Sequence, residues 1–222
     1  MALESEKIKE DVVNHLLWDS RLRSEKIDVS VTGNTVVLSG SVPSFRERMV
    51  AEADTWAVPG IASVENRVQI GDFSRVSDKQ LMENAVTVLH LNEVTEDQKI
   101  AVNVEDGKFV LSGSVDEYWK KTYTVDLLAH VKGVIDIIDN MAVVPGNQIA
   151  DESVAEDILE ALKRQGKIDV STITLEVSGG KAVIRGRVPD WQSFSDSYSI
   201  LKNTKGVAEI RNELTIVPEG VE

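Results

Sequence analysis

The stretch VVLSGSV at Val36–Val42 returns as FVLSGSV at Phe109–Val115 and again as AVIRGRV at Ala182–Val188. Each return comes 73 residues after the previous copy, and the flanking patterns return with it. A fixed period of this length indicates a small folding unit that is present three times. Any activity is therefore either repeated in each copy or built between copies.

Each copy begins with a predicted amphipathic helix followed by a half-buried strand. In the first copy, Ile8, Val12 and Leu16 recur at helical spacing. Apolar and polar residues then alternate over residues 27–31, as in a strand with one buried face. Polar residues at the helix starts are the predicted N-caps: Ser5, Ser77 and Asp151.

The second half of each copy reads as a hairpin return strand, a second helix and a last strand. Gly33-Asn34 tolerates positive φ and predicts the hairpin turn. Ser44 and Glu47 have the spacing of a capping box at the start of the second helix. A last strand is expected over residues 64–70, and its equivalents over 137–144 and 210–217.

The predicted fold is α+β: three tandem αββαβ units, each a three-stranded mixed sheet packed on two helices. The predicted domains are residues 1–72, 73–146 and 147–222.

Six glycines recur in register and are predicted to be structural. The glycine of the return strand shares a face with apolar residues, so we expect it to let a helix approach closely. A β-bulge is the alternative explanation. The second glycine of each copy is expected to end the second helix in a left-handed conformation. The six residues are Gly40, Gly60, Gly113, Gly133, Gly186 and Gly206.

Composition excludes several classes of function. A formal net charge of −13 repels phosphate backbones and argues against nucleic acid as a partner. The absence of cysteine excludes disulfides and thiolate chemistry. No stretch approaches the roughly 18 apolar residues of a transmembrane helix. The N-terminus has no apolar core of signal-peptide length, so we predict a cytoplasmic protein, or a periplasmic one if a signal peptide has been removed.

No constellation of residues predicts catalysis or a cofactor. His15, His90 and His130 are not equivalent in the repeat and lack metal-ligand spacing. Whether a metal site exists is therefore unknown. The polar residues Asn66, Asn140 and Asn212 precede the end of each last strand; they either tie the strand by hydrogen bonds or contribute oxygen ligands to a cation.

A possible binding surface lies in the third copy, where Arg185 and Arg187 replace serines and Trp191 follows. Alternatively, Glu176, Asp190 and Glu213 neutralise these arginines. Three tryptophans do not recur in register and are candidates for a partner surface: Trp18, Trp56 and Trp119.

The repeated unit resembles the BON domain, named for bacterial OsmY and nodulation proteins. VLSGSV at Val37–Val42, VPGI at Val58–Ile61 and VENRV at Val64–Val68 carry the resemblance in the first copy, and related segments recur in the other two. The second copy departs by one extra residue between Gly133 and Asn140, and the third by its two arginines.

The resemblance implies a role in osmotic or envelope stress and, for some members, contact with phospholipid surfaces. A cytoplasmic relative that pairs this domain with a LysM module binds potassium. The prediction is a non-catalytic stress-associated protein that contacts phospholipid or envelope components. The alternatives are a potassium-binding protein and a protein–protein scaffold, including one that self-associates.

Overall fold

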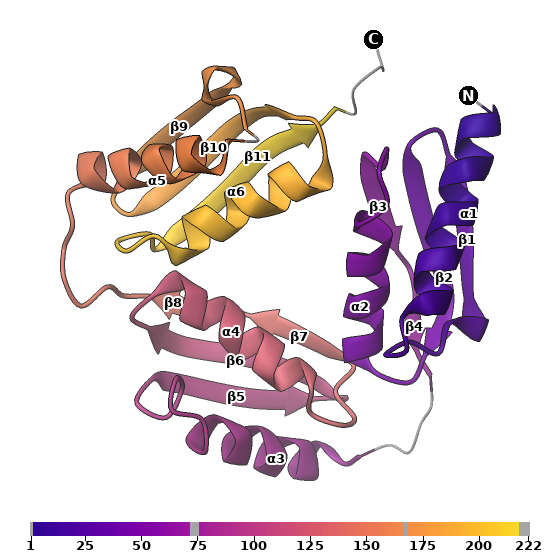
Figure 1. The fold of residues 1–222 in the computed structure, drawn as a ribbon. Coiled ribbons are helices and arrows are strands. Elements are labelled where there is room, and N and C mark those ends of the chain that lie inside the picture. Colours follow the sequence, from indigo (N-terminus) through magenta and orange to yellow (C-terminus); the bar gives the residue numbers. More distant parts are fainter. Residues whose placement is uncertain (1, 72–75, 167, 218–222) are drawn as a thin grey trace. The chain divides into compact units, whose positions relative to one another are not determined.

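The computed structural model describes residues 2–71, 76–166 and 168–217, in which six α-helices and eleven strands repeat one order of elements three times (Figure 1). The first copy contains α1 (Ala2–Trp18), η1 (Ser24–Lys26), β1 (Ile27–Thr32), β2 (Thr35–Val42), α2 (Phe45–Trp56), β3 (Ser63–Asn66) and β4 (Gln69–Ile70). The second contains α3 (Asp78–His90), β5 (Lys99–Glu105), β6 (Lys108–Val115), α4 (Tyr118–Ala129), β7 (Asp136–Asp139) and β8 (Ala142–Val143). The third contains α5 (Asp151–Gln165), η2 (Val170–Thr172), β9 (Ile173–Ser178), β10 (Lys181–Val188), α6 (Trp191–Asn203) and β11 (Glu209–Ile216). The predicted α+β fold of three αββαβ units is confirmed.

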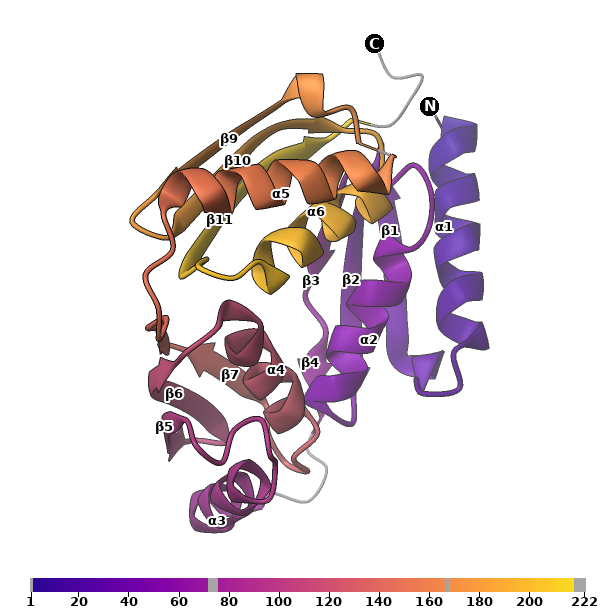
Figure 2. The same cartoon turned by 60° about the vertical axis from the view of Figure 1, so that its left-hand side comes forward.

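Each sheet is mixed and centres on the strand that carries the repeated motif. β1 pairs with β2 in antiparallel fashion, whereas β3 and β4 pair with β2 in parallel. The parallel pairing is possible because α2 supplies the crossover between β2 and β3. Figure 2 shows α5 and α6 together on one face of the third sheet, which leaves the other face uncovered by helices of that copy.

In the first two copies the expected last strand is divided into two short strands that both pair with the central strand, so these sheets count four strands and the third counts three. The interruption follows Asn66, whose Oδ1 accepts a hydrogen bond from the Val68 backbone N–H at 3.1 Å in a local turn. In the second copy Asp139 Oδ1 accepts from the Met141 N–H at 3.0 Å in the same way. In the third copy Asn212 Oδ1 accepts from the Leu214 N–H at 3.1 Å as well, yet β11 is continuous, so this bond alone does not break the strand.

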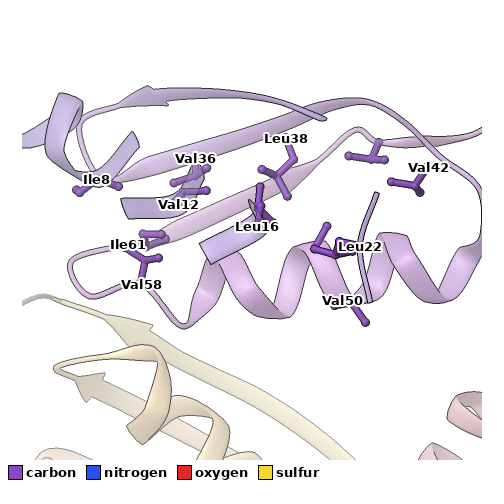
Figure 3. Packing of buried hydrophobic residues seen from close by; sticks show 12 residues of the cluster. Ile8, Val12, Leu16, Leu22, Val36, Leu38, Val42, Val50, Val58 and Ile61 are labelled. Carbon is purple, nitrogen blue, oxygen red and sulfur yellow. The ribbon is translucent and has the colours of Figure 1, made fainter. Parts of the chain in front are cut away.

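The helical stripe and the strand face meet in the core of each copy, as predicted. Val12 and Leu16 of α1 lie against Val36 and Leu38 of β2 (Figure 3). All the stripe residues are buried: Ile8, Val12, Leu16, Leu81, Ala85, Leu89, Val154, Ile158 and Leu162. Burial of this apolar surface is the main stabilising contribution in a unit this small.

One pair of core positions changes its residues in opposite directions between copies. The helix position holds Val12, then Ala85, then Ile158; the strand position holds Val36, then Phe109, then Ala182. All six side chains are fully buried. A large residue at one position accompanies a small one at the other, which conserves volume in a close-packed interior.

The reason that we predicted for the strand glycine was wrong. Gly40 and Gly113 are exposed, so no helix packs on them. A Cβ at Gly40 would overlap the carbonyl oxygen of Lys26, and one at Gly113 that of Lys99. Both residues have φ near +100°, at +105° and +102°. The glycine is thus required by its own backbone conformation and by the neighbouring strand. Small buried residues at equivalent positions lie on the second helix instead: Ala51, Thr124 and Ser197.

Two of the three predicted N-caps were wrong. Ser77 caps α3 by accepting from the Gln80 N–H at 3.3 Å, but Ser5 lies inside α1 and Asp151 is the first residue of α5. Asp151 instead binds the hairpin turn, because its carboxylate accepts from the backbone N–H groups of Gly179 and Gly180 at 2.7 and 3.0 Å. In the second copy the Asp78 carboxylate accepts in the same way from the backbone N–H groups of Asp106 and Gly107 in the hairpin turn.

Replacing Asp151 with alanine is expected to lower the thermal stability of the third copy, because both turn amides lose a charged acceptor. The same bonds lower the pKa of Asp151. Their contribution is therefore present above about pH 4 and is lost as the pH falls through the lowered pKa. Circular dichroism melting at neutral and acid pH measures this, with Glu152→Ala as the control. Equal effects of the two substitutions would contradict the prediction.

By packing, the chain divides into two compact units. One is built on Met1–Arg75 and includes Val188–Gln192; the other is built on Val76–Arg187 with Ser193–Thr215. Domain boundaries at residues 72/73 and 146/147 stay a prediction.

Candidate functional site

Large apolar side chains are exposed where the first helix of a copy ends. Leu17 is 59% exposed and Trp18, the last residue of α1, is 84% exposed. Leu91, the equivalent of Trp18 in the second copy, is 82% exposed. The third copy has exposed Arg164 at this position, in the last turn of α5. The sequence analysis singled out Trp18 but missed Leu17 and Leu91, although the repeat register relates Leu91 to Trp18.

Helix geometry explains why these residues face outward. Ile8, Val12 and Leu16 occupy the buried stripe at intervals of four residues. Since each residue turns the helix by about 100°, Leu17 and Trp18 lie off that stripe. Their exposure is therefore a consequence of the same register that buries the core residues.

Basic residues lie next to Trp18 in the chain. Arg21 and Arg23 are both exposed, in the segment that joins α1 to η1. The guanidinium of Arg21 binds the carboxylate of Asp19, with its Nε 2.9 Å from Oδ2. These bonds hold the pKa of Asp19 well below its usual range. Arg23 donates its backbone N–H to Glu47 Oε2 at 3.1 Å, which ties the segment to α2.

The two arginines of the predicted basic surface have different surroundings. Arg185 is half-buried, with Nη1 3.0 Å from Glu176 Oε2 and Nε 2.6 Å from Glu213 Oε2. Those carboxylates raise the pKa of the Arg185 guanidinium and neutralise it. Lys181 and Arg211 also pair with glutamates on this face. Arg187 is exposed. Positive and negative side chains alternate on this face of the third sheet, and their pairing weakens its attraction for an anionic ligand.

The remaining tryptophans are less accessible than Trp18. Trp191 is the first residue of α6 and is half-buried. Within the compact unit that contains both, its ring stacks on Trp56 with centroids 4.2 Å apart. Trp119 is half-buried and packs edge-on against Tyr123 at 6.2 Å. Trp18 therefore has the largest exposed aromatic surface of the four.

The asparagine series was misaligned in the second copy. Asp139, not Asn140, is equivalent to Asn66 and Asn212, since its carboxylate makes the same turn and it follows Gly133 at the same interval. No extra residue is present. Asn66 Nδ2 also donates to the Arg48 carbonyl at 3.0 Å and so ties its strand to α2. Lys121 Nζ lies 3.5 Å from Asp139 Oδ2 and replaces that tie in the second copy. These contacts give Asn66 and Asp139 a structural role.

The three histidines are exposed and lie on helices or just after one. His130 Nδ1 lies 2.8 Å from the Asp126 carbonyl oxygen. Among the described residues, no group of three or more His, Cys, Asp or Glu side chains is placed to hold a metal ion. In the same part of the chain, no helix combines the length and apolar character needed to span a bilayer.

No curated protein matches the chain. Solved structures that are similar include the C-terminal domain of CdsD, a structural protein of the type III secretion system of Chlamydia trachomatis. It is 16% identical, and the alignment covers 94% of this chain and 96% of that one, with a TM-score of 0.28. The periplasmic domain of the inner-membrane protein PrgH from S. typhimurium is 10% identical over 86% of this chain and 94% of that one, with a TM-score of 0.23. TM-scores this low do not establish a shared arrangement.

The family comparison is decisive by contrast. The BON domain model matches residues 4–72, 77–145 and 150–218, which together span nearly the whole chain. The three matches coincide with the three structural copies and with the repeated glycine motif. The chain therefore belongs to the BON domain family and contains three BON domains.

Proposed function

We propose that this chain is a non-catalytic, stress-associated protein that binds phospholipid surfaces through Leu17 and Trp18 at the end of α1. The observation that carries the proposal is the exposure of these adjacent side chains, 59% and 84%. Tryptophan favours the membrane–water interface, because its ring is apolar and its N–H still requires a polar partner. The association of BON domains with phospholipid and envelope contact supports the same reading.

The charge of the protein determines whether zwitterionic or anionic phospholipids are the better partners for the Trp18 surface. The net charge of −13 opposes approach to an anionic bilayer. Near Trp18, however, Arg23 is exposed and can meet lipid phosphates, whereas the Arg21 guanidinium is paired with Asp19. We therefore expect binding to zwitterionic vesicles, and weaker binding to strongly anionic ones. Leu91 is a weaker second contact, since exposed acidic residues follow it at Glu93, Glu96 and Asp97.

Co-sedimentation of the full chain with phosphatidylcholine vesicles tests the proposal. Trp18→Ala removes the largest apolar contact, so the vesicle affinity is expected to fall by about 10- to 100-fold, the equivalent of burying one large side chain. Val144→Ala is the matched control, because Val144 is 60% exposed but lies after β8, away from a first-helix end.

The co-sedimentation experiment has three informative outcomes. Loss of binding in the Trp18 variant with retention in the Val144 variant supports the proposed surface. No binding of the unmodified chain to zwitterionic or anionic vesicles at low salt would refute phospholipid binding. Equal losses in both variants would place the contact elsewhere.

The potassium-binding and scaffold alternatives stay predictions, as does the cytoplasmic location. Thermal melting in potassium and sodium at matched ionic strength tests the first alternative, and light scattering of the purified chain tests self-association. Cell fractionation addresses the location.

A further inference from the structure

Two aspartates share one arginine next to the exposed end of α1. Asp19 follows Trp18 in the chain, and Asp54 lies in the last turn of α2. Both are poorly accessible, since the Asp19 side chain is 15% exposed and the Asp54 side chain 17%. Two like charges in such a place are unfavourable unless they are compensated.

The Arg21 guanidinium lies near the carboxyls of both Asp19 and Asp54, but it forms hydrogen bonds only with Asp19. Arg21 donates its backbone N–H to Asp19 Oδ1 at 2.8 Å, and its side chain binds both oxygens of Asp19. Asp54 Oδ1 lies 3.8 Å from Arg21 Nη2, beyond hydrogen-bonding distance. Arg21 therefore compensates Asp19 and leaves Asp54 largely without a cation.

The second oxygen of Asp54 indicates how that carboxyl is satisfied. Asp54 Oδ2 is buried and, within the part of the chain that the structure describes, accepts no hydrogen bond. A buried carboxylate oxygen without a donor is costly. A protonated Asp54 removes the cost, because the neutral carboxyl becomes a donor to Asp19.

The charges around Asp54 agree with this assignment. Burial, followed by the charge of Asp19 and the hydrogen bond with it, raises the pKa of Asp54 to about 6. Arg21 and His15 of α1 favour the ionised form of Asp54 and only partly offset the increase in its pKa.

The other two copies show that the fold does not need this pair. The positions of Asp19 and Asp54 hold Asn92 and Leu127 in the second copy, and Gln165 and Ile200 in the third. An apolar residue on the second helix is therefore compatible with the BON fold, and the acidic pair is specific to the copy that carries Trp18.

We propose that Asp19 and Asp54 form a proton-operated latch, in which one shared proton fastens the segment after Trp18 to the end of α2. The effect of the latch on phospholipid binding through Trp18 rests on the proposed function. With the proton in place, the end of α1 is held firmly for contact. Loss of the proton leaves two facing carboxylates and loosens the segment.

The direction of the pH effect follows from the raised pKa of Asp54. A carboxyl whose pKa is higher in the folded protein than in the unfolded chain stabilises the fold at low pH and loses that effect as the pH rises through the folded value. Between about pH 5 and pH 8 the folding equilibrium of the first copy is expected to fall by up to about tenfold from this group. Asp19 contributes oppositely only at lower pH, where its own lowered pKa lies.

A ¹³C NMR titration of the Asp54 carboxyl in the full chain is the direct test, and urea unfolding across the same pH range is the second measurement. Asp54 is expected to titrate near pH 6. Asp54→Asn, which mimics the protonated carboxyl, is expected to abolish the pH dependence of the urea midpoint, whereas the control Asp28→Asn, at an exposed position of β1, retains it.

Binding to phosphatidylcholine vesicles at about pH 5.5 and pH 8 separates the latch from the proposed function. Wild-type binding is expected to weaken at the higher pH, whereas binding of Asp54→Asn stays constant. Titration of Asp54 near pH 4, or an Asp54→Asn variant with wild-type pH dependence of unfolding, overturns the latch whatever the vesicles show. Titration near pH 6 without vesicle binding at either pH supports the latch and refutes the proposed function.

Discussion

Replacing Gly113 with alanine is expected to destabilise the second BON domain by about 3 kcal/mol or more. The added Cβ would overlap the carbonyl oxygen of Lys99 on the neighbouring strand, where backbone and not a flexible side chain must move. The φ of +102° adds strain, since an L residue rarely adopts it. A domain of this size has a stability of only about 5 kcal/mol to lose.

Urea unfolding, followed by ¹H–¹⁵N NMR to assign the loss to the second copy, measures the effect. Gly146→Ala is the matched control, because Gly146 has no positive φ and open space around its Cα. Its unfolding midpoint is expected to match that of the unmodified chain. Similar midpoints for the two variants would contradict the steric explanation of the repeated motif.

Replacing Phe109 with alanine is expected to cost about 3–5 kcal/mol, because a fully buried ring leaves a cavity in the core. The third copy has Ala182 at this position and remains folded around Ile158, whereas the second copy has only Ala85 there. Adding Ala85→Ile to Phe109→Ala copies the arrangement of the third domain and is expected to restore part of the lost stability.

The double-mutant cycle measures the compensation. Ala85→Ile alone overfills the wild-type core and is expected to cost about 1–3 kcal/mol. If the two positions share one volume, the double variant is more stable than the sum of the single effects predicts, by about 1 kcal/mol or more. Strict additivity would show that the opposite size changes between copies are unrelated. Val110→Ala, half-buried on the same strand, is the control for a general weakening of β6.

Much of the fold was predictable because its determinants are local or periodic. The stripe of Ile8, Val12 and Leu16 predicted a helix and its buried face, and the spacing of Ser44 and Glu47 predicted the start of α2. The break in the last strand was not predicted. The asparagine alone does not encode it, because Asn212 makes the same side-chain bond in the third copy, where β11 is continuous.

The candidate site was only partly predictable. Trp18 stands out in the sequence because it does not recur, but its exposure follows from the register of α1 on the sheet. The sequence left Arg185 open between a binding role and neutralisation by nearby glutamates, and the structure pairs it with Glu176 and with Glu213 of β11. Charge patterns along the chain supply candidate partners, but the pairing itself depends on which residues the adjacent strands place opposite one another.

By itself, the sequence determined that this protein is a threefold repeat, which elements each copy contains and which helix faces are buried, because a 73-residue period and apolar spacing are read along the chain. Only the tertiary structure showed that a side chain at Gly113 would overlap a neighbouring carbonyl oxygen and that Arg185 is paired with a glutamate. It also showed that Asp19 and Asp54 lie near the same arginine and are both poorly accessible. Steric overlap and charge coupling depend on distances in space between residues far apart in the chain, and no local pattern encodes those distances.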